Sequence, residues 1–75
     1  MTHHAALDAT GLLCPLPVLK TAKRLRALAS GEVLRVETDD PAALIDMPHF
    51  CAESGHSLLS QEETATGMIW HLQKK

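Results

Sequence analysis

The sequence predicts an α+β fold: a two-layer α/β sandwich in which two helices cover one face of a four-stranded mixed sheet. Two segments carry apolar residues at helical spacing. Four short segments have strand character, in the order strand, helix, strand, helix, strand, strand (βαβαββ). The chain has 75 residues, is 45% hydrophobic and contains no internal repeat or long linker, so we expect one domain over residues 1–75. We expect that domain to be a monomer.

The four expected strands are bounded by turn residues or by the expected helices. They are His4–Asp8, Glu32–Thr38, His56 to about Glu62, and Met68–Gln73. The first ends at a Thr-Gly turn signal, and the second is rich in β-branched residues. In the last, Met68, Trp70 and Leu72 alternate with three other residues, which predicts that they share one face of the sheet, with Trp70 in the core.

The first helix is expected to extend from Pro17 to the Ser30-Gly31 pair, where glycine can adopt the left-handed conformation of a helix end. Its apolar stripe consists of Val18, Ala22, Leu25 and Ala29, and its opposite side carries Lys20, Lys23 and Arg24. A residue before proline disfavours the helical region, which leaves two possible starts. Either Cys14 is the N-cap of a helix that includes Pro15, or the helix begins at Pro17 with Cys14 in the loop before it.

The second helix is indicated by Asp39-Asp40-Pro41, an acidic cap followed by proline at a first helical position. Pro48 is expected to interrupt this helix, because proline inside a helix removes a hydrogen bond. We therefore expect a short helical turn over Ala42–Ile45 and a second start capped by Asp46. The second part should end at Gly55.

Composition and charge exclude several classes of protein. The formal net charge of -2 and the pI near 6.2 do not indicate a nucleic-acid-binding surface, so we expect no direct nucleic-acid partner. No stretch approaches the ~20 apolar residues that span a bilayer, and the apolar run Gly11–Leu19 lacks the basic segment of a signal peptide. We therefore expect no membrane partner. Two cysteines are too few for a secreted disulfide scaffold, which favours the reducing cytoplasm.

Cys14 precedes a Pro-Leu-Pro sequence at the start of the first helix, which is the positive end of the helix dipole. An exposed charge there gains roughly 0.3–1 kcal/mol, and one pKa unit corresponds to about 1.4 kcal/mol. We therefore expect the helix to lower the pKa of the thiol by less than about one unit. The prolines have no N–H, which leaves the Leu16 N–H as the chief backbone donor near the sulfur.

The chemistry of Cys14 is narrowed by its neighbours. The motif is CxxP rather than CxxC, which disfavours dithiol redox catalysis. A single accessible thiol at a rigid helix start suits a protein that receives a group and passes it on. The alternative is an inert cysteine that only caps the helix.

Cys51, His49 and Asp8 have structural interpretations. Cys51 lies in the second helix, where core packing is expected; a relay thiol is the alternative. His49 and Cys51 do not share a helix face, so we expect no metal site, and nothing indicates a cofactor. Asp8 is expected to orient the loop before Cys14 by hydrogen bonding. It is not expected to activate the thiol, because a nearby carboxylate raises the pKa of a thiol.

The residues around Cys14 resemble the signature of the TusA/SirA-like sulfur-carrier family. That signature is an aspartate, a glycine and Cys-Pro-x-Pro, matched here by Leu7-Asp8, Gly11 and Cys14-Pro15-x-Pro17. Two later segments resemble the stand-alone TusA branch in particular, namely Asp39-Asp40-Pro41-Ala42 and Asp46-x-Pro48-x-Phe50-Cys51. With the last strand pair, the resemblance covers nearly the whole chain from Leu7 onward.

The resemblance implies a sulfurtransferase that carries sulfane sulfur on Cys14 as a persulfide. It implies that the motif and active-site loop comprise Asp8, Gly11, Pro15 and Pro17. A cysteine desulfurase or rhodanese-type protein would supply the sulfur, and a downstream acceptor protein would take it. In the stand-alone TusA branch the product is the 2-thiouridine of a tRNA wobble base, whereas relatives serve sulfur oxidation or molybdenum-cofactor supply.

The basic side chains Lys20, Lys23 and Arg24 emerge from the helix that begins beside Cys14. As a group they are expected to dock an acidic patch on the sulfur donor or acceptor; the alternative is a solvated helix face. For the protein as a whole, the alternative function is a non-catalytic regulatory or protein-interaction module with the same fold.

Overall fold

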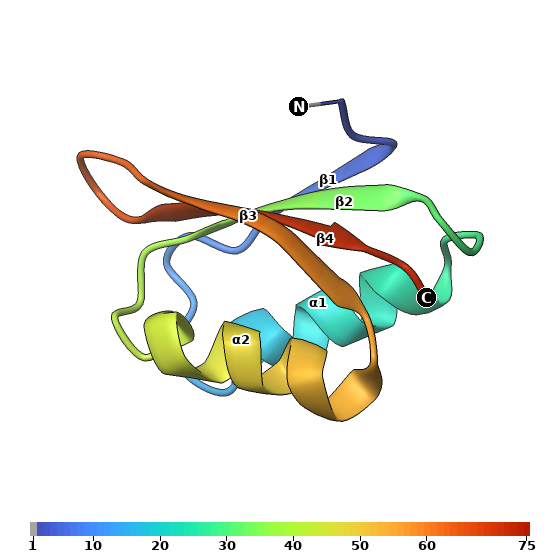
Figure 1. The fold of residues 1–75 in the computed structure, drawn as a ribbon. Helices are drawn as coiled ribbons and strands as arrows, with labels where there is room; N and C mark the ends of the chain where they lie inside the picture. Colours follow the sequence, from blue (N-terminus) through green and yellow to red (C-terminus); the bar gives the residue numbers. More distant parts are fainter. Residues whose placement is uncertain (1) are drawn as a thin grey trace.

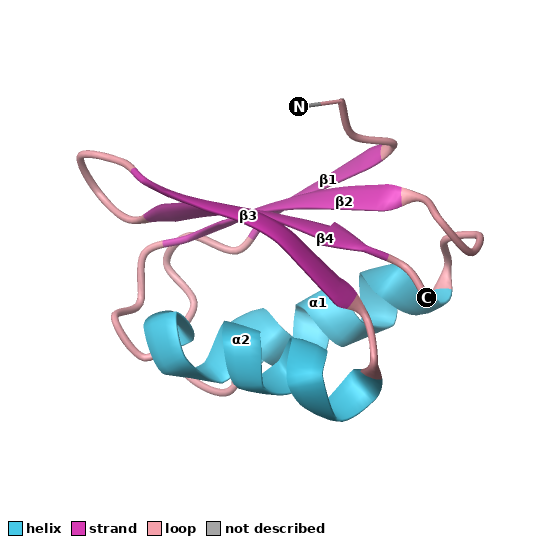
Figure 2. Cartoon of the chain, viewed as in Figure 1, coloured by secondary structure: helices cyan, strands magenta, loops and turns pink. Residues whose placement is uncertain are grey.

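A computed structural model describes residues 2–75 and confirms the predicted α+β fold, with two helices on one face of a four-stranded sheet (Figures 1 and 2). The elements are β1 (Ala5–Asp8), α1 (Leu16–Arg26), β2 (Val33–Thr38), α2 (Ala43–Ser54), β3 (Ser57–Glu63) and β4 (Met68–Gln73). Each strand therefore lies within one residue of its expected bounds.

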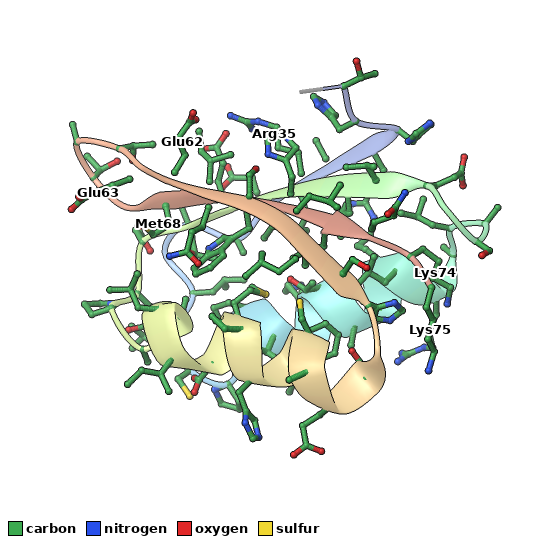
Figure 3. The ribbon with its side chains drawn as sticks, viewed as in Figure 1. Arg35, Glu62, Glu63, Met68, Lys74 and Lys75 are labelled. Atoms are coloured by element: carbon green, nitrogen blue, oxygen red, sulfur yellow. The ribbon has the colours of Figure 1, made fainter. Side chains whose placement is uncertain are left out.

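The sheet is mixed, with the strand order β1-β2-β4-β3. β1 runs parallel to β2, with α1 as the crossover between them, and the other neighbours are antiparallel. A register shift between Leu58 and Ser60 produces a β-bulge in β3. Arg35 and Glu62 project from the face of the sheet that the helices leave uncovered (Figure 3). The helices therefore cover one face of the sheet, and charged side chains lie on the other.

The core lies between the other face of the sheet and the two helices. Trp70 and Leu72 of β4 are fully buried, as their alternation in the sequence predicts. They pair with Val36 and Leu34 of β2, which are also fully buried. The Trp70 indole N–H donates to Thr38 Oγ1 at 2.9 Å, so both polar groups are hydrogen-bonded although they are buried in the core. The helices complete the core with Leu25, Ala43, Met47 and Cys51.

Helix α1 begins at Leu16 with Pro15 at the N-cap, between the two predicted starts. The Cys14–Pro15 peptide bond is cis. The expected end at Ser30-Gly31 is wrong, because the helix ends at Arg26 and Ala27 is its C-cap. The Leu28 N–H bonds to the Leu25 carbonyl, a tighter turn that closes the helix early. Gly31 does adopt a positive φ of 89°, but in the turn that leads into β2.

The buried side of α1 also differs from the predicted stripe. Pro17, Thr21 and Leu25 are buried, whereas Val18 and Ala22 are half-buried and Ala29 is exposed. Ala29 lies beyond the end of the helix, which removes it from the helical stripe. Thr21 can occupy the core because its hydroxyl donates to the Pro17 carbonyl at 2.7 Å.

Helix α2 is continuous from Ala43 to Ser54, so the predicted break at Pro48 is wrong. Pro48 lacks an N–H to donate to the Leu44 carbonyl, but the Leu44 side chain is half exposed at 50%, on a side of the helix that water can reach. Asp46 is therefore a residue of the first turn and not a helix cap. Gly55 ends the helix with a φ of 85° and bonds to the Cys51 carbonyl, as expected.

Gly67, in the turn between β3 and β4, lies against the backbone at the end of β2. A Cβ at this position would lie 2.0 Å from the Thr38 carbonyl oxygen and 2.9 Å from Asp39 Cα. We expect Gly67→Ala to lower the free energy of unfolding by about 1–3 kcal/mol, because backbone must move to make room. Urea unfolding measures this, with Thr66→Ala as the exposed control in the same turn. Equal stability of Gly67→Ala and the wild type would contradict the close approach.

Candidate functional site

Cys14 lies in the loop between β1 and α1, two residues before the helix begins, and its side chain is exposed. Asp8 orders the beginning of this loop: its carboxylate accepts hydrogen bonds from the Thr10 N–H at 3.0 Å and the Thr10 hydroxyl at 2.6 Å. These bonds hold the pKa of Asp8 below its ordinary value, with the hydroxyl bond as the larger cause. Gly11 follows with a φ of 78°, a conformation that favours glycine.

The end of β2 fixes the rest of the loop through two carboxylates. Asp39 accepts a bifurcated hydrogen bond from the Gly11 N–H at 2.9 and 3.0 Å, and Asp40 accepts one from the Cys14 N–H at 2.7 Å. The parallel pairing of β1 with β2 explains the meeting, because the carboxyl ends of parallel neighbours lie at the same edge of a sheet. The backbone at Cys14 is therefore held by a charge-assisted bond from a residue 26 positions away.

The thiol itself is bonded to a third carboxylate. Cys14 Sγ donates a hydrogen bond to Asp46 Oδ2 at 3.0 Å, a contact made by the first turn of α2. This bond raises the pKa of Cys14 above its ordinary value; desolvation and the negative charges of Asp46 and Asp40 add to it.

The expectation of a lowered pKa for Cys14 is therefore wrong. The expected donor is also unavailable, because the Leu16 N–H bonds to the Leu13 carbonyl at 2.9 Å. The helix dipole acts weakly on an exposed group, whereas a direct bond from the thiol to a carboxylate favours the neutral thiol.

An apolar groove of about 340 Å³ extends from the thiol between α1 and α2. It is lined by Cys14, Pro15, Val18, Asp46, His49, Phe50 and Glu53. The α2 residues that line it are Phe50, which is apolar, and three polar residues; of these, His49 Nε2 lies 3.3 Å from Glu53 Oε1. The groove therefore joins an apolar floor to a carboxylate that contacts the sulfur.

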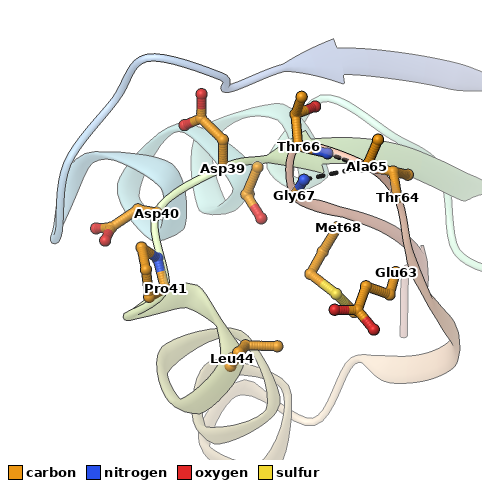
Figure 4. Close-up of a pocket in the computed structure, with 11 residues that line it drawn as sticks. Asp39, Asp40, Pro41, Leu44, Glu63, Thr64, Ala65, Thr66, Gly67 and Met68 are labelled. Atoms are coloured by element: carbon orange, nitrogen blue, oxygen red, sulfur yellow. Dashed lines mark hydrogen bonds between the residues drawn. The ribbon is translucent and has the colours of Figure 1, made fainter.

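A second hollow, of about 240 Å³, lies where the β3–β4 turn meets the segment between β2 and α2 (Figure 4). Asp39, Asp40 and Glu63 supply its acidic groups. Neither Cys14 nor Asp46 lines it, so the exposed thiol belongs to the groove between the helices.

The sequence-predicted basic residues form a separate surface. Lys20, Lys23 and Arg24 are exposed and, with Leu7, line a shallow hollow of about 210 Å³ between α1 and β1. The structure brings these three residues together but does not place them in the groove that contains Cys14. Pro15 does line that groove, whereas Pro17 is buried in the first turn of α1 and does not line it.

Cys51 is buried, with 4% of its surface exposed, and desolvation raises its pKa. Among residues 2–75, no three side chains of the metal-ligating types are close enough to hold an ion. Over the same described residues, none of the helices has the length and hydropathy required to span a membrane.

Sequence reasoning missed Asp39, Asp40 and Asp46 as residues of the site. It interpreted all three as helix-start signals, although their carboxylates bond to the Cys14 loop and its sulfur. Two signals draw attention to them: each aspartate has a proline nearby, and all three lie in the segments that resemble the stand-alone TusA branch. Which loop they contact is set by the sheet, which is a long-range feature.

Fold and site together define a small thiol protein: one exposed cysteine, on a loop fixed by carboxylates, at the open end of an interhelical groove. Residues 5–74 match the family model described as "Sulfurtransferase TusA". The chain belongs to the TusA sulfurtransferase family.

Curated relatives and a solved structure agree with this assignment. A protein named "Sulfur carrier protein TusA" from Pseudomonas entomophila is 47% identical over 75 residues, spanning 100% of this chain and 94% of the relative. One of the same name from Pseudomonas paraeruginosa is 44% identical over 77 residues, spanning 100% of this chain and 98% of the relative. The crystal structure of a SirA-like protein from Desulfitobacterium hafniense superposes with a TM-score of 0.78 at 25% identity, covering 93% of this chain and 95% of that one.

Proposed function

We propose that this chain is a sulfur carrier, a single domain that accepts sulfane sulfur on Cys14 as a persulfide and passes it to an acceptor protein. The observation that carries the proposal is the contrast between the two thiols. Cys14 is exposed at the end of a groove, on a backbone fixed by Asp40, whereas Cys51 is buried in the core. The sulfur carriers to which the chain is similar support the same role.

The transfer needs only thiol chemistry. The Cys14 thiolate attacks the outer sulfur of a donor persulfide, R–S–SH, and a new S–S bond forms as the donor's S–S bond breaks. The products are Cys14–S–SH and R–S⁻, and R–S⁻ takes up a proton in place of the one that Cys14 released. An acceptor thiolate then attacks the outer sulfur in the same way. No net oxidation occurs, so no cofactor is required.

The donor in this proposal is a cysteine desulfurase or a rhodanese-type protein, and the acceptor is a downstream sulfur-relay protein in the reducing cytoplasm. The resemblance to the stand-alone TusA branch favours the 2-thiouridine of tRNA as the final product, reached through the relay and without direct contact with tRNA. The exposed basic surface of Lys20, Lys23 and Arg24 supports docking to an acidic patch on one of these proteins.

Sulfur uptake tests the proposal directly. The chain is incubated with a cysteine desulfurase and cysteine, alkylated, and weighed intact; one added sulfur atom is expected. Trypsin then separates the two thiols, since Cys14 falls in residues 1–20 and Cys51 in residues 36–74. The added sulfur is expected only on the first peptide. An unmodified chain would overturn the carrier function and favour a protein-interaction module.

A further inference from the structure

Within residues 2–75, the hydrogen-bond partner of the Cys14 sulfur is an acceptor, the Asp46 carboxylate. The thiol donates to Asp46, the N–H of the same cysteine is used by Asp40, and the nearest helical N–H, that of Leu16, is bonded to Leu13. A thiolate at this position would lose the bond to Asp46 and would lie beside a carboxylate 3.0 Å away. The free chain therefore holds the sulfur in the form that reacts slowly.

The other charged groups near the sulfur do not reverse this effect. Asp40 is a second carboxylate, and α1 contributes no charged side chain to the groove. On α2, His49 lies beside Glu53, so its charge when protonated is offset by that neighbour. The end of the groove at Cys14 is thus acidic.

Resting on the carrier function proposed above, we propose that Asp46 restrains the Cys14 thiol in the free chain and that a cationic side chain of the sulfur donor, entering along the groove, releases the sulfur by pairing with this carboxylate. The occupant is a donor segment that carries a lysine or arginine next to an apolar side chain. Val18, Phe50 and Pro15 provide the apolar contacts, and Asp46 provides the opposite charge.

The exposed apolar residues beside the site fit such a segment. Leu13, the neighbour of Cys14, is 70% exposed, and Ile45, the neighbour of Asp46, is 76% exposed. Both would be covered by a protein that fills the groove, which would also remove water and strengthen the new ion pair. Pairing neutralises Asp46, the thiol proton passes to solvent, and the thiolate then attacks the donor persulfide as described above.

The first experiment measures the rate of Cys14 alkylation by iodoacetamide against pH, in the chain alone. We expect Asp46→Asn to react faster than the wild type below the pKa of the thiol and more slowly on the high-pH plateau. For each unit by which the pKa of the thiol falls, the thiolate fraction at low pH rises tenfold, while the thiolate becomes about threefold less nucleophilic. The rate should therefore rise about threefold below the pKa and fall about threefold on the high-pH plateau. Asp46→Glu, which keeps the charge, is expected to retain the raised pKa.

The crossing of the two profiles separates control of the thiol from a merely structural role. A loosened loop would change both limbs in the same direction. The matched control is Glu62→Gln, which removes one charge from the opposite face of the sheet and should leave the profile unchanged. If the profiles of Asp46→Asn and wild type coincide, or differ without crossing, Asp46 does not restrain the thiol.

The second experiment tests the preference for a cation, with one cationic and one neutral methanethiosulfonate reagent. The aminoethyl reagent is cationic and the methyl reagent is neutral; both form a mixed disulfide at Cys14 and release methanesulfinate. Because both react with the same thiolate, the change in the ratio of their rates from wild type to variant reports the change in local charge. We expect this ratio to fall about fivefold in Asp46→Asn, as for one unit charge about 4 Å away in water. An unchanged ratio would overturn the proposed cation site.

Neither experiment uses a persulfide, so each outcome is independent of sulfur uptake. If the chain takes up no sulfur but the two alkylation profiles cross, Asp46 restrains the thiol of a protein that is not a sulfur carrier. Uptake on Cys14 with coincident profiles would leave a carrier whose thiol is not controlled by Asp46.

Discussion

Cys14→Ser is expected to abolish sulfur uptake from a cysteine desulfurase, with no gain in intact mass. Serine keeps the size of the side chain, and the bond from the backbone N–H of residue 14 to Asp40 does not depend on the side chain. The loop should therefore persist while the sulfur that forms the S–S bond is lost. A hydroxyl has neither the acidity nor the nucleophilicity of a thiol at neutral pH.

The matched control for this loss is Cys51→Ala, which removes the other thiol from the chain. Cys51 is buried, so its role in the structure is packing in α2 and its removal should leave uptake intact. The intact mass of each variant after incubation with desulfurase and cysteine shows which cysteine takes up the sulfur. If Cys14→Ser still takes up sulfur and Cys51→Ala does not, the carrier thiol is Cys51 and the role proposed for Cys14 is wrong.

Trp70→Ala is expected to cause the largest loss of stability among single core substitutions, about 3–5 kcal/mol in the free energy of unfolding. Trp70 is the largest fully buried side chain, and it lies between the sheet and the helices. Its removal leaves a cavity and deprives Thr38 Oγ1 of its donor. Since small domains are stable by only about 5–15 kcal/mol, much of the native state's margin would disappear.

Urea unfolding followed by far-ultraviolet circular dichroism measures this loss. Trp70→Phe keeps an aromatic ring but loses the indole N–H, and should fall between the wild type and Trp70→Ala. Glu62→Gln, on the open face of the sheet, should stay within about 0.5 kcal/mol of the wild type. A cost below about 1 kcal/mol for Trp70→Ala would mean that the core does not depend on this side chain.

The sheet could be predicted well because its signals are local. The alternation of Met68, Trp70 and Leu72 requires a period of two, and the structure places Trp70 and Leu72 in the core. The helices were harder to predict, since their ends depend on packing. Ser30-Gly31 is a good helix end in isolation, but α1 closes at Arg26. Pro48 is a good helix break in isolation, but α2 continues through it where one side of the helix faces solvent.

The sequence alone determined that a thiol stands before a proline-rich helix start, after an aspartate and a glycine that shape the loop. How that thiol behaves depends on the tertiary structure. The carboxylates that hold its backbone and its sulfur are 26 and 32 residues away, and the meeting of β1, β2 and α2 brings them to it. A hydrogen bond at 3.0 Å outweighs the weak field of a helix end, so the pKa of Cys14 is raised where local reasoning predicts it to be lowered.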